Sequence, residues 1–281
     1  TGRVIGFGGR VLKTDSKTAK YVNSPESLIY HKSQTLYGIY FAKNKIRDED
    51  NCFLAEGYTD VISLHQSGIE NTVASSGTSL TVEQIRLINR FTKNVTILFD
   101  GDAAGIKASL RGIDMILEEG LNVKIVLFPD GHDPDSYVKS VGGTAFREYV
   151  KEKQQDFILF KASILLKDAQ NDPLKRAEVI RDIIESIAKI PDSIKASVFV
   201  SETSRLLQMD EAILMSELNK LKLKGAKAKE KEKEKEGSSS LPPYDPSFGY
   251  PPELHGLIDI EPVPEIPVDN DDPQEEEKIR M

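Results

Sequence analysis

The sequence predicts an α/β fold in which a mostly parallel sheet is flanked by helices. Between about residues 51 and 128, short apolar runs that suit buried strands alternate with segments of helical length. Strands that alternate with helices in this way form right-handed β-α-β units, and such units build parallel sheets. The 281 residues are enough for a sizeable core and for more than one domain.

Each element of this alternation has a signal of its own. Strands are expected over residues 52–57, 71–77, 94–100 and 122–128, because each is a short apolar run beside turn residues. Helices are expected over residues 58–68, from Thr81 to about Arg90, and over residues 103–120. Gly68 is a suitable C-terminal stop for the first helix, and Thr81 is a suitable N-cap for the second.

The segments on either side of the alternation have different patterns. Residues 1–50 have glycines and turn residues that predict a β-rich segment. After a sheet domain at 51–150, apolar residues recur at helical spacing and predict a small helical subdomain over 151–224. Residues 225–281 are charged, then Pro-rich and acidic, which is typical of a disordered linker or tail.

Charge is distributed unevenly along the chain. The net charge is −8, but residues 241–281 hold 11 acidic and 2 basic residues, so the rest is close to neutral. Residues 1–47 hold nine Lys and Arg against two acidic residues. Such a basic segment suits a polyanion such as nucleic acid, and the alternative is an ordinary solvated surface.

Several protein classes are disfavoured by composition. The chain has one cysteine, Cys52, so a disulfide framework and a zinc site built from cysteines are both excluded, and a reducing, cytoplasmic location fits best. No apolar stretch approaches the length of a membrane span, so we expect no membrane partner.

Three acidic motifs follow predicted strands, and they are FLAEGYTD, ILFDGDAAG and LFPDGHDPDS. Ligands of a parallel sheet bind outside the carboxyl ends of its strands, so we expect these motifs to meet in one crevice. The motifs carry six carboxylates: Glu56, Asp60, Asp100, Asp102, Asp133 and Asp135. Clustered carboxylate oxygens suit Mg²⁺, and they indicate metal-assisted phosphate chemistry.

Most of these residues also have a purely structural interpretation. Asp100 and Asp102 fit an Asp-Gly turn with a capping Asp, and Asp60 fits the first turn of a helix. Asp133 or Asp135 fits a helix N-cap. Glu56 is harder to explain this way, because it closes an apolar strand before glycine and has no evident capping role.

The order of these motifs resembles the Toprim fold, which primases, topoisomerases and some nucleases share. The resemblance extends to the RNA polymerase domain of bacterial DnaG-type primases, densely over residues 1 to about 150. It rests on seven blocks in the same order: RVIGFGGRVL, KYVNSPES, YHKSQTLYGI, EGYTDVISL, ASSGTSLT, FDGDAAGIKA and FPDGHDPDSYV.

This resemblance implies a role for each site residue. Glu56, Asp100 and Asp102 look like the catalytic residues and the principal Mg²⁺ site, with Mn²⁺ as a substitute, and Asp60, Asp133 and Asp135 look like the rest of the acidic cluster. Template or nucleotide contacts are implied for four further residues: Arg10, Lys20, Asn23 and Lys32.

The expected activity is DNA primase, a nucleotidyltransferase that makes RNA primers on single-stranded DNA from ribonucleoside triphosphates. The resemblance also implies parts beyond this chain, namely an N-terminal zinc-binding domain and a C-terminal domain that binds the replicative helicase. Two alternatives remain: another Toprim enzyme, such as a nuclease or topoisomerase fragment, or a non-catalytic module that holds single-stranded DNA or a replisome partner.

Overall fold

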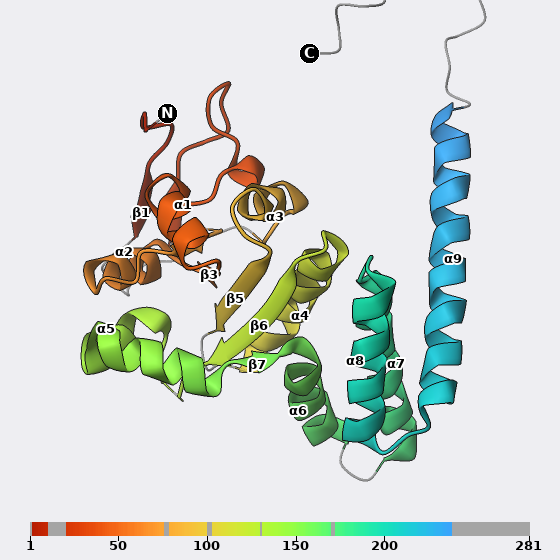
Figure 1. The fold of residues 1–281 in the computed structure, drawn as a ribbon. Coiled ribbons are helices and arrows are strands. Elements are labelled where there is room, and N and C mark those ends of the chain that lie inside the picture. Colours follow the sequence, from red (N-terminus) through yellow and green to blue (C-terminus); the bar gives the residue numbers. More distant parts are fainter. Residues whose placement is uncertain are drawn as a thin grey trace, which may run out of the picture. The chain divides into compact units, whose positions relative to one another are not determined.

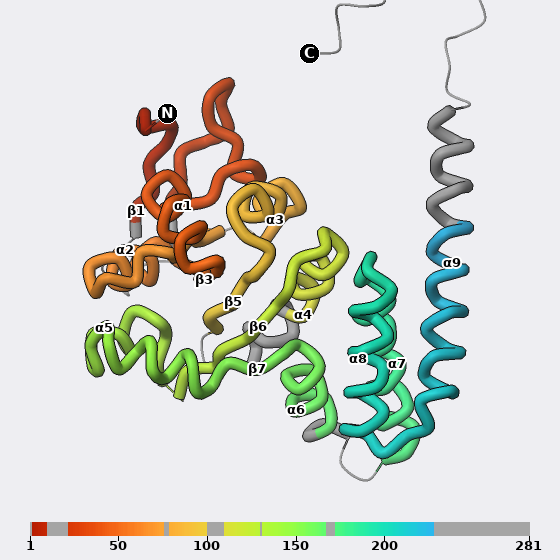
Figure 2. Tube along the Cα trace, viewed as in Figure 1, coloured from red at the N-terminus to blue at the C-terminus, as the bar shows by residue number. Residues whose placement is uncertain are grey.

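The computed structural model describes residues 2–10, 21–75, 79–99, 103–129, 131–169 and 172–237 (Figures 1 and 2). The chain divides into two compact units, Thr1–Ala228 and Lys229–Met281, and the first of them contains the sheet and the helices that pack on it. Within the described part of the chain, no helix is both long enough and apolar enough to cross a membrane.

A five-stranded sheet forms the centre of the first unit (Figure 1). Its strands, in spatial order, are β4 (Thr72–Ala74), β3 (Cys52–Ala55), β5 (Asn94–Phe99), β6 (Asn122–Leu127) and β7 (Gln155–Asp156). The first four are parallel, and the two-residue β7 joins the edge in antiparallel orientation. The predicted mostly parallel sheet is therefore confirmed, whereas β7 is too short to give a sequence signal.

Both faces of the sheet are buried, because successive side chains of a strand point to opposite faces. Phe53, Leu98 and Val126 pack in one core cluster, which α2 (Tyr58–Gln66) and α5 (Pro134–Lys153) cover. Leu54, Ile97 and Ile125 belong to the opposite cluster. The helices on that side are α1 (Ile39–Asp48), α3 (Val82–Asn89), α4 (Ala103–Glu118), α6 (Phe157–Ala169) and α7 (Pro173–Lys189).

Local capping signals place several of these helices. Thr81 caps α3 and accepts a hydrogen bond from the Gln84 amide, while the Gln84 side chain accepts one from the Thr81 amide. This reciprocal pair is a capping box, and it confirms the expected start of the helix. Asp172 and Asp192 cap α7 and α8 (Ser193–Leu207) by accepting bonds from amides in the first turn.

Within residues 2–10 and 21–50, the described part of the N-terminal segment, the structure is less β-rich than the sequence predicts. It has two short antiparallel strands, β1 (Gly8–Arg10) and β2 (Tyr21–Asn23), a 3-10 turn η1 (Lys32–Gln34), and the helix α1. The prediction misses α1 because its helical period has only two buried positions, Ala42 and Ile46. Both of them pack in the core beside the sheet, so tertiary contacts define this helix.

The helical region also extends beyond its predicted end. The sequence predicts disorder from Gly225 onward, yet α9 runs from Glu211 to Gly237. Lys, Glu and Ala have high helix propensity, so the low-complexity run continues the helix. Residues 238–281, the remainder of the predicted tail, lie outside the described residues.

A buried polar network joins this helical region to the sheet domain. Lys161 of α6 is only 1% exposed, and its Nζ lies 3.6 Å from Asp114 Oδ1 of α4 and 3.4 Å from Asp182 Oδ2 of α7. The ammonium also donates to Ser186 Oγ, and that hydroxyl donates to Asp114. A buried ammonium is stable only when it is paired, so these three helices are fixed together through one side chain.

We expect Lys161→Met to lower the free energy of unfolding by about 1–3 kcal/mol, because it keeps the packing but removes the only cation of the described network. The figure is modest because Asp114 and Asp182 are 31% and 46% exposed and are solvated once the lysine is gone. Urea denaturation measures the change, with the exposed Lys175→Met of α7 as the control. Equal stability of Lys161→Met and the wild type would contradict this role.

Candidate functional site

The carboxyl ends of three neighbouring strands lie side by side at one edge of the sheet (Figure 1). Leu54 of β3 is in register with Ile97 of β5, and Phe99 at the end of β5 is in register with Leu127 at the end of β6. Glu56 follows β3 at this edge, and its side chain is exposed. The three strands that precede the acidic motifs are therefore neighbours in the sheet, and their carboxyl ends lie at the same edge.

Asp100 and Asp102 were ranked with Glu56 on sequence, and both lie outside the described residues. Their place in the chain is still informative, because Phe99 ends β5 directly before Asp100 and α4 begins at Ala103 directly after Asp102. The two residues therefore belong to the connection that leaves the carboxyl end of β5.

Asp60 is a buried carboxylate that connects two of the motifs. It lies in the first turn of α2, is 6% exposed, and accepts a 2.9 Å hydrogen bond from the Gly57 amide. Its other oxygen accepts a 3.3 Å bond from the amide of Asp135, a residue 75 positions further along the chain. Asp60 therefore has the expected role at a helix start, and it also holds the starts of α2 and α5 together.

The electrostatic environment of Asp60 is unfavourable to its charge. The pKa of Asp60 is raised to about 6, chiefly because the carboxyl is buried; the negative charges of Asp133 and Asp135 contribute to the rise, and the hydrogen bonds from the Gly57 and Asp135 amides oppose it. Three of the six predicted carboxylates are therefore close enough to influence one another, as the proposed cluster requires.

Asp133 and Asp135 have local partners as well. Asp133 is the N-cap of α5 and accepts a 2.7 Å bond from the Ser136 amide, so the capping interpretation is correct for this residue. Asp135 accepts a hydrogen bond from Ser63 Oγ of α2 and lies 2.6 Å from Lys139 Nζ. The side chains of Asp60 and Asp135 thus hold the α2–α5 junction in place beside the strand ends, while Asp133 caps α5.

The chemistry of the donor set fits a hard divalent cation. The described acids offer only carboxylate oxygens, which are the ligands that Mg²⁺ prefers, and accumulated negative charge is the condition that a cation relieves. Among the described residues alone, no three His, Cys, Asp or Glu side chains are arranged to hold a metal ion.

Tyr58 attaches the N-terminal segment to this acidic edge. It begins α2 two residues after Glu56, and its hydroxyl donates a 2.7 Å hydrogen bond to Asn23 Oδ1 at the end of β2. Gly8 of β1 packs so closely on the Tyr58 ring that an added Cβ would lie 2.6 Å from ring atoms. Tyr58 is not among the residues predicted to be functional, although its place between Glu56 and Asp60 in the EGYTD motif indicates a role near the acidic residues.

Three of the four residues that are predicted to contact template or nucleotide lie in the described part of the chain. Asn23 is at the acidic edge through Tyr58, and Arg10 ends β1 opposite Tyr21. Lys32 begins η1, where its amide donates to Glu26 and its carbonyl accepts a 3.0 Å bond from the Gln84 side chain of α3. Lys20 lies outside the described residues.

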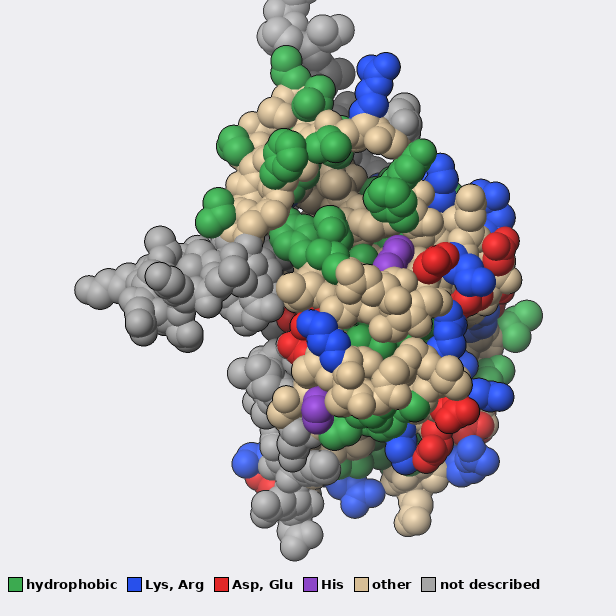
Figure 3. Space-filling view, turned by 90° about the vertical axis from the view of Figure 1, so that its left-hand side faces the viewer, with side chains coloured by type: hydrophobic (Ala, Val, Ile, Leu, Met, Phe, Trp, Pro, Cys, Tyr) green, Lys and Arg blue, Asp and Glu red, His purple; other side chains and the backbone are tan. Residues whose placement is uncertain are grey.

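The surface of the N-terminal segment is more apolar than its charge suggests. Apolar side chains gather on the upper part of the face in Figure 3, and the exposed ones from this segment include Val4, Phe7, Val22, Leu28 and Phe41. Within the described part of this segment, three basic side chains contact other side chains of the chain: Lys43 lies over the Tyr40 ring, Lys45 pairs with Glu49, and Arg47 lies over the Phe91 ring. The number of basic residues in this segment therefore overstates how many are available to bind nucleic acid.

Comparison with known proteins gives the class of protein first. Residues 53–138 match a family model described as Toprim-like, and this range runs from β3 into α5. The parallel sheet with its acidic carboxyl edge is thus that of a Toprim-like protein. Residues 1–43 match the N-terminal domain of the DNA primase catalytic core, and residues 169–212 match the DnaB-helicase binding domain of primase.

Relatives and solved structures then identify the family. A DNA primase of Clostridium acetobutylicum is 43% identical over 208 residues, which are 72% of this chain and 33% of the relative. A DNA primase of Aquifex aeolicus is 37% identical over 219 residues, 78% of this chain and 42% of the relative. The chain belongs to the bacterial DnaG-type DNA primases, and it spans about a third of the length of the first of these relatives.

Solved structures agree with this assignment. A DNA primase domain from Pseudomonas aeruginosa superimposes with a TM-score of 0.68 at 35% identity, covering 79% of this chain and 68% of that one. The catalytic domain of a DnaG primase bound to single-stranded DNA has a TM-score of 0.64 at 35% identity, covering 73% of this chain and 66% of that one. The resemblance to the primase family and its fold is therefore confirmed.

One match bears on the expected helicase contact. The resemblance places helicase binding in a domain outside this chain, whereas the helicase-binding model matches residues 169–212, which form α7 and α8. A candidate region for that partner thus lies within the chain.

Proposed function

We propose that this chain is the catalytic core of a DNA primase, which joins ribonucleotides into short RNA primers on a single-stranded DNA template. The observation that carries the proposal is the shared carboxyl edge of β3, β5 and β6, where Glu56 and the Asp60–Asp135 contact lie together. Glu56, Asp100 and Asp102 act as the catalytic residues in this proposal. The other acids, Asp60, Asp133 and Asp135, complete the acidic cluster.

Mg²⁺ is the cofactor that this donor set fits, and Mn²⁺ is a reasonable substitute. When bound, such ions neutralise the triphosphate and lower the pKa of the attacking 3′-hydroxyl. The chain's own contribution is to place the acidic side chains: the Gly57 amide fixes Asp60, and Asp60 in turn fixes the start of α5. Positioning of this kind supplies much of the catalysis in phosphoryl transfer.

The template and the incoming nucleotide belong, in this proposal, on the N-terminal segment beside the acidic edge. The Tyr58–Asn23 hydrogen bond keeps β2 next to Glu56, so nucleic acid held by Asn23 would be near the acidic residues. Arg10, Lys20 and Lys32 are the further contacts of this proposal. The exposed aromatic side chains Phe7 and Phe41 offer faces on which unpaired bases can stack.

Primer synthesis tests the proposal directly. The chain receives a single-stranded template, ribonucleoside triphosphates and Mg²⁺, and short RNA is the expected product. Nicking or relaxation of duplex DNA without RNA would favour another Toprim enzyme. Template binding without either reaction would favour a non-catalytic module.

We expect Lys32→Ala to weaken the binding of a single-stranded oligonucleotide and to make it less dependent on salt. Each lost phosphate contact lowers the slope of log K against log salt by about 0.7 for single strands. Fluorescence anisotropy at several salt concentrations measures the slope, and Lys175→Ala on α7 is a control with the same change of charge. An unchanged slope in Lys32→Ala would remove this residue from the binding surface.

The replicative helicase is the second proposed partner. The support is the match of residues 169–212 to a helicase-binding model, which places the candidate contact on α7 and α8. Because these helices share the large core cluster with the sheet, a helicase bound there would be held in a fixed relation to the acidic edge.

A further inference from the structure

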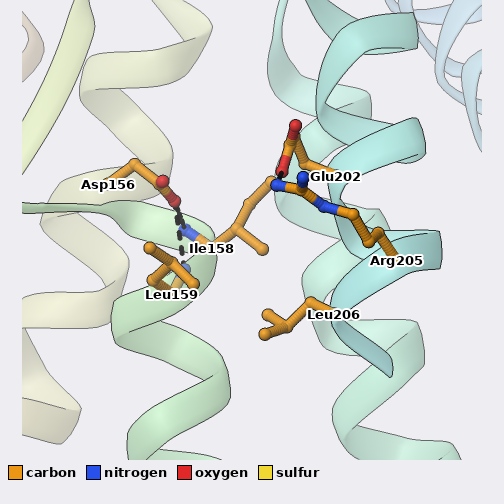
Figure 4. A pocket seen from close by; sticks show the side chains of 6 residues that line it. All are labelled: Asp156, Ile158, Leu159, Glu202, Arg205 and Leu206. Atoms are coloured by element: carbon orange, nitrogen blue, oxygen red, sulfur yellow. Dashed lines mark hydrogen bonds and ion pairs between the residues drawn. The ribbon is translucent and has the colours of Figure 1, made fainter. Parts of the chain in front are cut away.

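Polar side chains of this chain differ in whether they bond to near or to distant residues. In the pocket of about 350 Å³ between α6 and α8, Asp156 accepts hydrogen bonds from the first amides of α6, and Arg205 pairs with Glu202 (Figure 4). These partners are two or three positions away. The contact between α3 and η1 is different, because side chains of α3 hold the backbone of a segment 48 to 52 positions earlier in the chain. This contact therefore determines where η1 and its Lys32 lie.

The turn η1 has no buried residue of its own. Tyr30 and Leu36 are buried on either side of it, but Lys32, Ser33 and Gln34 are at least partly exposed. A 3-10 turn is short and its internal hydrogen bonds have poor geometry, so without an apolar anchor it has little that fixes its conformation. Hydrogen bonds from other elements to its backbone therefore decide how it is held.

Gln84 of α3 supplies two of these hydrogen bonds. Its side chain is fully buried, and its Nε2 donates bonds of 3.0 Å to the Lys32 carbonyl and 2.8 Å to the Thr35 carbonyl. Its Oε1 accepts the 3.2 Å bond from the Thr81 amide that belongs to the capping box. Both N–H donors and the oxygen of the amide are thus engaged, so the side chain has one orientation and holds the two carbonyls at fixed positions.

Two further contacts hold the same turn. Thr81 Oγ1 donates a hydrogen bond to the Ser33 carbonyl, and the Glu26 carboxylate accepts a 2.9 Å bond from the Lys32 amide. That amide is the main reason that the pKa of Glu26 is lowered, so the carboxylate is ionised at neutral pH. The peptide groups on both sides of Lys32 are therefore fixed, and none of these contacts uses its ammonium.

Helix α3 is a firm support for this turn. Ile85 and Ile88 pack in the large core cluster. The Arg86 guanidinium donates two bonds of 3.0 Å to the Glu119 carboxylate, and the Asn89 side chain donates a 3.2 Å bond to the Glu119 carbonyl just after α4. The helix is thus fixed to the sheet domain by contacts that do not involve η1.

We propose that Gln84, together with Thr81, is a positioning residue for nucleic-acid binding, which fixes the backbone of η1 so that the Lys32 ammonium meets a phosphate of the bound single strand. This inference rests on the proposed function, and it adds the residues that place Lys32. A lysine side chain loses much conformational freedom when it binds, so a backbone that is already fixed lowers the cost. Because η1 lies within residues 1–43 and α3 within residues 53–138, the two parts that match different family models are joined at this contact.

The salt dependence of oligonucleotide binding tests this role. Gln84→Met keeps the approximate size and the charge of the side chain and removes both donors to η1. A loss of stability alone does not change the number of phosphate contacts, whereas a displaced Lys32 loses one. We therefore expect the slope of log K against log salt to fall by about 0.7, although the substitution changes no charge. Fluorescence anisotropy of a labelled single-stranded oligonucleotide measures the slope, below the melting temperature of every variant.

Asn89→Ala is the matched control for Gln84→Met. It removes a side-chain hydrogen bond of the same helix, from α3 to Glu119, and leaves the contacts with η1 in place. Its melting temperature should fall while its slope stays at the wild-type value. A decrease of the slope in Asn89→Ala equal to that in Gln84→Met would show that any weakening of α3 has this effect, and the specific role of Gln84 would be refuted.

The double variant of Gln84→Met with Lys32→Ala shows whether Gln84 acts through Lys32. We expect its slope to equal that of Lys32→Ala alone. A further decrease in the double variant would overturn the inference, because Gln84 would then act through other contacts. A wild-type slope in Gln84→Met beside a lowered slope in Lys32→Ala would refute the inference and leave the proposed function intact. An unchanged slope in Lys32→Ala would refute both the inference and the proposed contact of Lys32.

Thr81→Val and Thr81→Ser provide a second test, which does not depend on the folding of Gln84→Met. Valine lacks the hydroxyl that donates to the Ser33 carbonyl, and serine retains it. We expect the slope to fall in Thr81→Val and to return to the wild-type value in Thr81→Ser. Wild-type slopes in both variants would mean that the hydroxyl does not help to position Lys32, and Thr81 would be removed from the proposal.

Discussion

Primer synthesis by Glu56→Gln is expected to fall roughly 10²- to 10³-fold, which corresponds to a loss of about 3–4 kcal/mol of transition-state stabilisation. The substitution keeps the size of the side chain and removes its charge at the carboxyl edge of β3. Gly57 is the N-cap of α2, so Glu56 has no capping duty, and its exposed side chain is not part of either core cluster. The melting temperature should therefore change little.

The matched control is Glu70→Gln. Glu70 is also an exposed glutamate beside a strand, but it precedes β4 and so lies at the amino edge of the parallel sheet, away from the three strand ends. RNA synthesis by this control should equal that of the wild type. Titration of Mg²⁺ by calorimetry gives a second measurement, in which Glu56→Gln should bind the ion more weakly. Full activity of Glu56→Gln would remove it from the catalytic residues.

The strands that carry the acidic motifs could be predicted from sequence because their signals are local. The strands β3, β5 and β6 are mainly apolar, although β5 contains Thr96 and β6 contains Lys124, and a carboxylate follows each strand within three residues. Burial on both faces of a parallel sheet favours such runs. The capping of α3 by Thr81 and of α5 by Asp133 is local for the same reason, since cap and amide are three residues apart.

Contacts between distant residues could not be predicted in this way. The Asp60 contact with the Asp135 amide joins residues 75 positions apart, and the Tyr58–Asn23 bond joins residues 35 positions apart. Helix α1 follows Gly38, which has a φ of 83° and would bring an added Cβ within 2.9 Å of Val61 on α2. The need for glycine at this position comes from neighbours that are distant in the sequence, so the local pattern does not reveal where the helix begins.

The stability of the metal-free chain is expected to decrease as the pH rises from about 4 to about 6, because of Asp60. Its folded pKa of about 6 is higher than its ordinary value of 3.8, so the folded state binds a proton more tightly than the unfolded state does in that window. The contribution of Asp60 to stability is therefore fully present below pH 4 and is lost as the pH rises through 6. The difference of about two pKa units between the folded and unfolded states corresponds to about 3 kcal/mol in the free energy of unfolding.

Replacement of Asp60 by Asn should remove this dependence, because the amide does not titrate. An Asn side chain has one acceptor oxygen for the two amides of Gly57 and Asp135, so we expect a loss of about 1 kcal/mol from the missing hydrogen bond. The wild type should accordingly be the more stable protein at pH 4.5, and the variant should equal or exceed it at pH 8. Urea denaturation in EDTA at both values measures the difference.

Asp48→Asn is the control for this experiment, since Asp48 is an exposed residue of α1 whose replacement causes the same change of charge. Its stability should follow that of the wild type at both pH values. A divalent cation at the acidic edge favours the ionised form of Asp60, so added Mg²⁺ should raise the melting temperature of the wild type more at pH 8 than at pH 5. If Mg²⁺ raised the melting temperature equally at both pH values, the ion would not interact with Asp60 and its neighbours. The acidic cluster would then serve only to join α2 and α5.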